Sequence, residues 1–181
     1  MRLLLLFCVL SCSLASFTNA QNVRLEDHIY NEHIRTVLLY PAIDDPENPA
    51  RLLKPAINPL NSDAPLVLEF DDLSGQFEGY RAKIIHCNAD WSKSNLNDIE
   101  FTYEYNEYPI HSSEQSFSTK VPYFHYRLEL PKLKLSGNYV VYVYAERGRK
   151  VILSRRFMLY ENRVNIDAKA RFSQGIQQQF T

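Results

Sequence analysis

Hydrophobic and polar residues alternate along several short stretches of this chain, and a period of two residues is typical of a strand with one buried face. LVLEFD, residues 66–71, and FHYRLEL, residues 124–130, show this alternation most clearly. Pro131 is expected to end the second of these strands because proline cannot donate a backbone hydrogen bond. Two further strands are predicted over IRTVLLY, residues 34–40, and YRAKIIHCN, residues 80–88.

The strongest local signal lies in GNYVVYVYAERGRKVILSRRFMLYE, residues 137–161, where two β-branched and aromatic runs flank a polar turn around Gly148. This pattern predicts a β-hairpin. Tyr139 opens the first strand just after Gly137 and resembles the tyrosine corner of immunoglobulin-like domains, whose hydroxyl bonds the backbone of the turn. The alternative is an ordinary strand tyrosine after a turn glycine. Helical periodicity is weak, with at most one turn between residues 92 and 99.

Prolines dominate one long connection. Six of the nine prolines lie between residues 41 and 65. Because proline disrupts helix interiors and central strands, this stretch is predicted to be extended along a sheet edge, with a short strand near residues 52–60 and no helix. LSGQFEG, residues 73–79, is predicted to be a turn.

About seven short strands without intervening helices predict an all-β fold, an immunoglobulin-like antiparallel β-sandwich over residues 21–161. The paired cysteines of antibody domains are missing, so the likeness is one of architecture. The alternating run VNIDAKA, residues 164–170, follows the strand that should complete the sandwich. Residues 162–181 are therefore interpreted as the start of a second domain that is cut off.

The N-terminus has the features of a signal peptide. A basic residue precedes LLLLFCVLSCSLA, residues 3–15, which is shorter than the roughly 20 apolar residues that a membrane-spanning helix needs. SFTNA follows, and its small residues predict a signal peptide over residues 1–20 with cleavage between Ala20 and Gln21. A lipoprotein signal at Cys12 is the alternative, which the continuing apolar run disfavours.

Composition and charge then describe the mature chain. Hydrophobic residues make up 45% of the sequence, enough for a packed core. Cleavage leaves Cys87 as the single cysteine, so no internal disulfide is expected. The 19 basic and 21 acidic residues that remain give no basic excess for binding nucleic acid. We expect an exported protein without stable membrane insertion.

IIHCNADWSKSNL, residues 84–96, concentrates chemically active side chains. His86 and Cys87 are neighbours in a strand, so their side chains should point to opposite faces and not bind one metal ion. A nucleophilic role for Cys87 would need an oxyanion turn that does not follow it, so a buried free thiol is favoured. His86 is expected to be a packed strand histidine with a hydrogen-bond partner.

The strand exit that follows is rich in turn-forming residues. Asp90 is expected to cap the turn with its carboxylate, and Trp91 to fold back over the core. Ser92, Ser94 and Asn95 supply further hydrogen bonds. We interpret these five residues as a fold-defining segment and as a candidate partner-facing surface.

DIEFTYEYNEYP, residues 98–109, is both acidic and aromatic. Paired carboxylates that flank a cleft can hydrolyse glycosides. Yet Phe101, Tyr103 and Tyr105 also fit one face of an ordinary strand with the glutamates solvated on the other, and the period favours the strand. The motifs GxSxG, GxxxxGK and GxGxxG are absent. No catalytic, cofactor-binding or metal-binding residues are predicted, and no small-molecule substrate.

Five blocks of sequence are more specific than the architecture. They are VRLEDHIYNEHIRTVLLYP (residues 23–41), LVLEFDDL (66–73), YRAKIIHCNADWSKSNLNDIEF (80–101), VPYFHYRLELP (121–131) and SGNYVVYVY (136–144). In this order they resemble the N-terminal domain of the type IX secretion system plug protein family. HCNADWSKSNL and PYFHYRLELP are the most distinctive parts, and RRFMLYE, residues 155–161, fits the closing strand.

The resemblance implies a periplasmic plug. Such proteins close the periplasmic mouth of a giant outer-membrane β-barrel translocon when no substrate is engaged. The system exports surface adhesins used in gliding and degradative enzymes. The family is not enzymatic and has no agreed catalytic residues, so contact with the barrel would be the function. Its members are considerably longer than this chain.

A different class of function remains open from the residues alone. Trp91 and the tyrosines between Tyr103 and Tyr108 would form a stacking platform in a secreted carbohydrate-binding or adhesion module, provided that their rings face solvent. A hydrolase is a third hypothesis, and it would need an acidic cleft that the sequence does not reveal.

Overall fold

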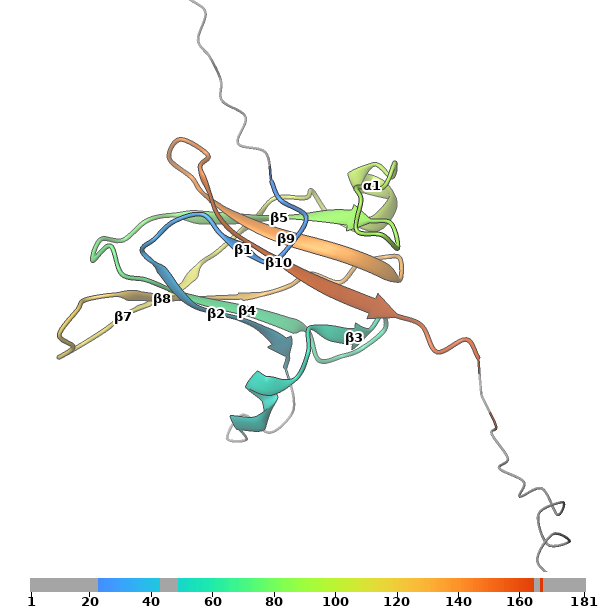
Figure 1. The fold of residues 1–181 in the computed structure, drawn as a ribbon, viewed down its shortest axis with the longest axis horizontal. Helices are drawn as coiled ribbons and strands as arrows, with labels where there is room; N and C mark the ends of the chain where they lie inside the picture. The colour runs from blue at the N-terminus through green and yellow to red at the C-terminus, as the bar shows by residue number, and fades with distance from the viewer. Residues whose placement is uncertain (1–22, 43–48, 165–166, 168–181) are drawn as a thin grey trace, which may run out of the picture.

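The computed structural model describes residues 23–42, 49–164 and 167 of the 181-residue chain. The predicted signal peptide, its cleavage between Ala20 and Gln21, and most of the proposed second domain lie outside these residues. Within them, ten strands form two facing sheets, which confirms the predicted all-β sandwich (Figure 1). Seven of the ten strands are at least four residues long, and three are short additions.

The larger sheet has the strand order β1-β10-β9-β5-β6, with β3 also paired to β10. Its strands are β1 (His28–Ile29), β3 (Ile57–Pro59), β5 (Tyr80–Cys87), β6 (Tyr108–Pro109), β9 (Gly137–Ala145) and β10 (Val151–Tyr160). All pairs are antiparallel except β3 with β10. Between β1 and β3, the backbone N–H of Arg156 donates to Asp27 Oδ1 at 2.7 Å, so a side chain continues the pairing along the edge of β10.

The smaller sheet has the order β2-β4-β8-β7, and all of its pairs are antiparallel. Its strands are β2 (Ile34–Pro41), β4 (Leu66–Asp72), β7 (Ser112–Gln115) and β8 (Phe124–Glu129). The predicted strands over 34–40, 66–71, 80–88 and 124–130 and the predicted hairpin are therefore confirmed to within a residue or two.

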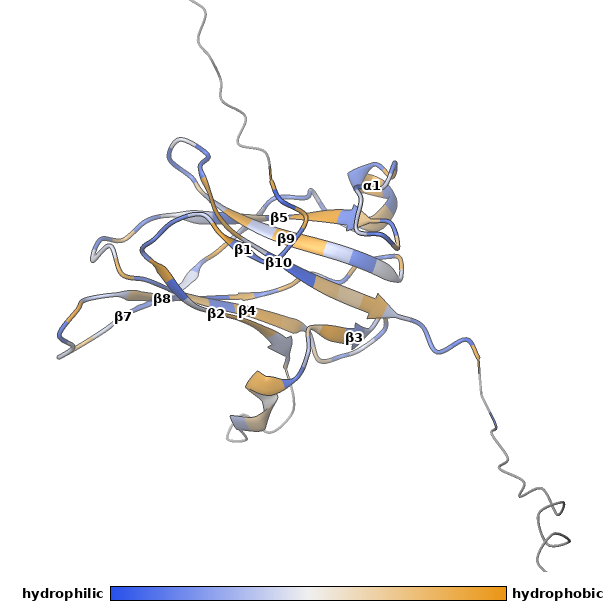
Figure 2. Ribbon diagram, in the orientation of Figure 1, coloured by the Kyte–Doolittle hydropathy of each residue, from blue (hydrophilic) through white to orange (hydrophobic). Residues whose placement is uncertain are grey.

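Alternating side chains of both sheets build one core. Along β9, Tyr139, Val141 and Val143 belong to the core cluster, whereas the outward Tyr142 is partly exposed. Figure 2 shows hydrophobic colour in the middle of this strand. In β4 and β8, Phe70 and Tyr126 stack with their ring centroids 5.1 Å apart. The period of two residues in the sequence thus identified the inward face of β4 and β8.

The predicted tyrosine corner is present. The Tyr139 hydroxyl donates a hydrogen bond of 2.7 Å to the Leu135 carbonyl. Gly137, just before it, has φ of 152°. A Cβ atom at this glycine would lie 2.9 Å from Nε2 of His86, so the corner also needs a residue without a side chain.

The proline-rich connection contains one helical element, contrary to the prediction. A 3₁₀ helix, η1 (Pro49–Leu53), precedes the short strand β3, which was expected near residues 52–60. Pro49 occupies the first turn, where its missing N–H would have had no helical partner. Figure 2 shows η1 projecting from the sandwich, with hydrophobic colour over only part of it.

The strand predicted for residues 98–109 is also wrong in its first half. A single helical turn, α1 (Asp98–Phe101), starts there, and the Asn97 N–H donates to Glu100 Oε2 at 2.7 Å. Phe101 is turned into the core, whereas Tyr103 and Tyr105 face solvent. The Asn97–Glu100 capping pair outweighs the two-residue period of the aromatic side chains.

Candidate partner-binding surfaces

The exit from β5 is a closed turn built from the segment that the sequence singled out. The Asn88 N–H donates to the Ser92 carbonyl (2.8 Å), and the Trp91 N–H donates to the Asn88 carbonyl (3.0 Å). Asp90 Oδ1 accepts hydrogen bonds from the Ser92 N–H (2.9 Å) and hydroxyl (2.6 Å). These bonds stabilise the carboxylate and lower the pKa of Asp90. Asp90 therefore caps the turn as expected.

Ser94 and Asn95 differ in their surroundings. Ser94 is buried, its N–H donates to the His86 carbonyl (3.0 Å), and its hydroxyl oxygen accepts from the Leu96 N–H (3.3 Å). Asn95 is exposed, as are Asp90 and Ser92. Ser94 thus contributes to the fold, while the three exposed residues leave polar groups available at the surface.

Trp91 does not fold over the core between the sheets, which corrects the expectation. Its ring lies against Arg156, whose guanidinium carbon is 4.3 Å from the ring centroid. Arg156 projects from the outer face of β10, because its neighbour Phe157 belongs to the core cluster. Trp91 is half-buried there with a left-handed backbone, φ 66°. A cation–π contact therefore occupies one face of the ring.

His86 and Cys87 point to opposite faces of β5, as expected. Cys87 is a buried free thiol on the outer face, and burial raises its pKa. His86 packs on the inner side, edge-on to the Tyr139 ring with centroids 5.0 Å apart. Its Nδ1 has no hydrogen-bond partner among the described residues, which corrects the expected partner. Burial lowers the pKa of His86 because the charged form loses water.

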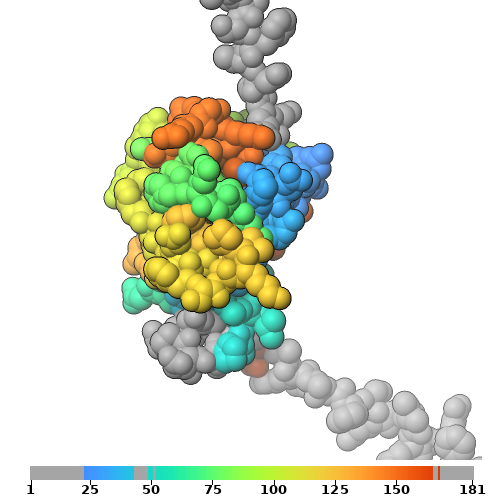
Figure 3. All heavy atoms as spheres, turned by 90° about the vertical axis from the view of Figure 1, so that its left-hand side faces the viewer, coloured from blue at the N-terminus to red at the C-terminus, as the bar shows by residue number. Residues whose placement is uncertain are grey.

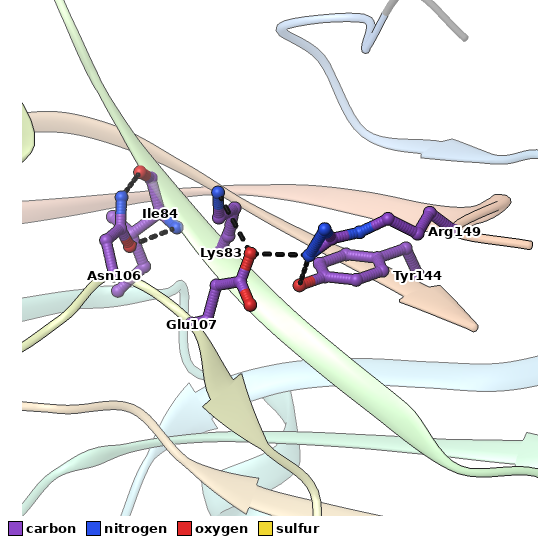
Figure 4. Close-up of polar contacts among 6 residues, drawn as sticks. All are labelled: Lys83, Ile84, Asn106, Glu107, Tyr144 and Arg149. Carbon is purple, nitrogen blue, oxygen red and sulfur yellow. Dashed lines mark hydrogen bonds and ion pairs between the residues drawn. The ribbon is translucent and has the colours of Figure 1, made fainter. Parts of the chain in front are cut away.

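Asn106 fixes the acidic and aromatic segment against β5, a role that was not predicted from the sequence. Its Oδ1 accepts from the Ile84 N–H (3.0 Å), and its Nδ2 donates to the Ile84 carbonyl (2.8 Å) (Figure 4). The buried amide therefore imitates a strand partner beyond the short β6. No sequence pattern distinguishes this asparagine from a solvated one, because its role depends on the edge of a distant strand.

Two carboxylates of this segment are engaged in separate contacts. Glu107 Oε1 binds Lys83 Nζ at 3.2 Å and Arg149 Nη2 at 2.6 Å (Figure 4). Burial acts to raise the pKa of Glu107, but these cations outweigh it and lower the pKa. Arg149 also stacks over the Tyr144 ring, 5.3 Å from the centroid. Glu100 accepts the capping bond of α1. Glu100 and Glu107 therefore support the structure.

Tyr103 and Tyr105 are exposed at 69% and 78%. Lys134 lies over the Tyr103 ring at 5.5 Å from the centroid and donates to the Ile99 carbonyl at 2.7 Å. One tyrosine of the proposed stacking platform is thus partly engaged. Trp91 projects from a different loop, and its ring is shared with Arg156.

In the described part of the chain, no three or more His, Cys, Asp and Glu side chains are grouped so that they could hold a metal ion. No helix among the same residues is long and apolar enough to cross a membrane.

Comparison with solved structures finds a related fold. The crystal structure of a hypothetical protein from Parabacteroides merdae ATCC 43184 has a TM-score of 0.69 and 27% sequence identity with this chain. The match covers 77% of this chain but only 35% of that one, so the compared region is about a third of the solved protein. A comparison with curated proteins gave no match.

Comparison with protein families identifies the domain. The profile described as "Type 9 secretion system plug protein 1st domain" matches residues 34–161. This range begins at the first residue of β2 and ends one residue after β10, so it covers all but the first of the described strands. The chain therefore belongs to the type 9 secretion system plug protein family, as its sequence blocks indicated, and its sandwich is the first domain of that family.

Proposed function

We propose that this protein closes the periplasmic side of the outer-membrane translocon barrel of the type IX secretion system while no substrate is engaged. The observation that carries this proposal is the match of residues 34–161 to the first domain of the plug family. The signal peptide predicted over residues 1–20 supports delivery to the periplasm. The cargo that would pass this gate is the set of gliding adhesins and degradative enzymes that the system exports.

The proposed action is protein–protein contact and not catalysis. Side-chain hydrogen bonds fix the exit turn of β5, and Asn106 fixes the segment beside it. A preorganised surface loses little conformational entropy when it binds. Glu100 and Glu107 are held by local partners, so their arrangement favours a structural role. Neither a cofactor nor a nucleic acid is part of the proposal.

The test is a pull-down from detergent-solubilised envelopes of cells that express the barrel. The complete gene product and a chain of residues 21–164 carry the same tag, and mass spectrometry identifies what accompanies each. We expect the complete product to recover a giant outer-membrane barrel. Recovery by the shorter chain as well would place a docking surface in the first domain. Absence of the barrel from both samples, but not from whole envelopes, would falsify the proposal.

A carbohydrate-binding module is the second candidate, and the exposure of Tyr103 and Tyr105 favours it. The contact of Trp91 with Arg156 weighs against it, because only one ring face remains for a sugar. This function predicts saturable glycan binding that is lost in Tyr105→Ala and weakened in Trp91→Ala. Equal binding by the wild type and both variants would exclude the platform.

A further inference from the structure

A hollow of about 500 Å³ lies at the end of the sandwich where β10 finishes. Its walls come from three segments that are distant in sequence: Leu60 and Asn61, Tyr103, Glu104 and Tyr108, and Pro131, Lys132 and Leu133. This exit hollow combines aromatic, proline and aliphatic surfaces with one carboxylate and one ammonium group. Aromatic side chains are enriched at protein–protein interfaces, and charged groups are kept mainly at the polar rim.

Hydrogen bonds hold two walls of the exit hollow together. Thr102 and Leu133 form a β-bridge, and the Lys134 N–H donates to the Phe101 carbonyl at 2.9 Å. The Lys134 ammonium then connects Ile99 and Tyr103. Because these bonds lie within the domain, the hollow is preformed and needs no partner to shape it.

The chain leaves the sandwich beside this hollow. The carbonyl of Tyr160, the last residue of β10, accepts a hydrogen bond of 2.8 Å from the N–H of Leu60, which lines the hollow. The Ser136 hydroxyl donates to Glu161 Oε2 at 3.0 Å and fixes the next residue. Figure 1 shows the end of β10 and α1 at the same end of the molecule. A polypeptide that continues past Val164 therefore starts close to the exit hollow.

We propose that the exit hollow is the docking site of the domain that follows this one in plug proteins. The matching family profile describes the first domain of plug proteins, which implies that further domains follow it. The matched region likewise covers only 35% of the Parabacteroides merdae chain. Interfaces between domains of one chain bury roughly 600–1,500 Å². The interface would therefore extend from the hollow over the exposed Ile99, whose carbonyl accepts from Lys134, and over the exposed Leu135, which follows Lys134 in the chain. This inference concerns contacts within one polypeptide and goes beyond the proposed plugging.

The opposite end of the molecule offers a matched control. Figure 3 shows it, with the β7–β8 loop in gold beside the β4–β5 turn in green. Phe117 in this loop is 85% exposed, and Phe77 in the turn is 64% exposed. The loop also carries the exposed Lys120. Both ends of the molecule therefore present apolar side chains and a lysine. Only the end with the exit hollow lies beside Tyr160, where the chain leaves β10.

The test uses amine-reactive cross-linking and mass spectrometry on the purified complete gene product at low concentration. A mixture of isotopically labelled and unlabelled protein separates links within one chain from links between chains. We expect Lys132 to be linked within the chain to lysines beyond residue 181. The same links from Lys120 should be many-fold less abundant. Absence of such links from Lys132, or a complete product without a following domain, would overturn the inference.

Two variants sharpen this test. Tyr103→Asp places a charge in the exit hollow and should remove the Lys132 links, whereas Phe117→Asp should preserve them. Circular dichroism checks that both variants are folded. If Tyr103→Asp leaves the links intact but prevents recovery of the barrel from envelopes, the hollow binds the translocon and the inference is wrong. The cross-links are measured on purified protein without the barrel. A negative cross-linking result therefore says nothing against the plug proposal, which the pull-down tests.

Discussion

At Tyr139 a single hydroxyl group ties the turn before β9 to the strand itself. We expect Tyr139→Phe to keep the core filled but to lower the free energy of unfolding by about 1–2 kcal/mol, because the Leu135 carbonyl loses its donor. Urea unfolding of the mature protein measures this loss. Tyr105→Phe is the control, since Tyr105 is exposed. Equal midpoints for Tyr139→Phe and the wild type would show that the corner does not stabilise the fold.

His86 gives the fold a defined dependence on pH. Burial lowers its pKa in the folded state below the unfolded value of about 6.5. As the pH falls through that value, the unfolded chain takes up a proton that the folded chain resists. Stability is therefore fully present above the unfolded pKa and declines as the pH falls toward the folded pKa.

His86→Phe should remove this part of the acid sensitivity while it keeps a ring beside Tyr139 and Phe101. The measurement is the urea midpoint at pH 7.5 and 5.0 for both proteins, and the wild type should lose more stability on acidification. A loss in His86→Phe as large as in the wild type would assign the sensitivity to other groups.

At the scale of elements, one amide side chain replaces a missing strand. Asn106 satisfies both backbone groups of Ile84 at the edge of β5. Asn106→Ala should lower the free energy of unfolding by about 2–4 kcal/mol, because two buried hydrogen bonds are lost and their partners stay buried. Asn95→Ala, at an exposed position, is the matched control and should change it by less than about 0.5 kcal/mol.

Hydrogen exchange locates the effect of this change. Faster exchange in Asn106→Ala should be concentrated at Ile84 and in the segment between α1 and β6, because Asn106 connects these elements. Uniform acceleration through the sandwich would instead indicate that only global stability has changed.

At the scale of the whole molecule, the thiol count tests both processing and packing. The predicted cleavage between Ala20 and Gln21 would leave Cys87 as the single cysteine of residues 21–181, and this thiol is buried. In a chain expressed as residues 1–181 and exported, a thiol reagent should therefore react slowly with the native protein and modify one thiol per chain after unfolding, because reaction needs an accessible thiolate. Three reactive thiols after unfolding would show that the signal peptide had not been removed.

The sequence predicted much of the fold because strand patterns are local. Alternation along β4 and β8 follows from the opposite directions of successive side chains, so residues such as Phe70 and Tyr126 could be assigned to one face of a strand without coordinates. Its errors occurred where two local signals compete. At residues 98–101 the capping pair of Asn97 and Glu100 prevailed over aromatic alternation, and at Pro49 a short helix formed within a proline-rich connection.

The candidate surfaces were less predictable than the fold. The hydrogen bonds between Asp90 and Ser92 could be expected, since the two residues are only two positions apart in the chain. The position of the Trp91 ring could not, because it depends on Arg156, 65 positions further along the chain. The partner-facing role of the exposed residues at this exit remains a prediction.

The sequence by itself determined the strand pattern, the sandwich class, the turn chemistry and the family, since each depends on the order and spacing of neighbouring residues. Only the tertiary structure decided that Asn106 pairs with Ile84, that Glu107 joins Lys83 and Arg149, and that three separated segments form the exit hollow. The physical reason is distance along the chain. Side-chain periodicity fixes which face of a strand is buried, but contacts between distant segments arise only when strands pair and loops meet in the folded chain.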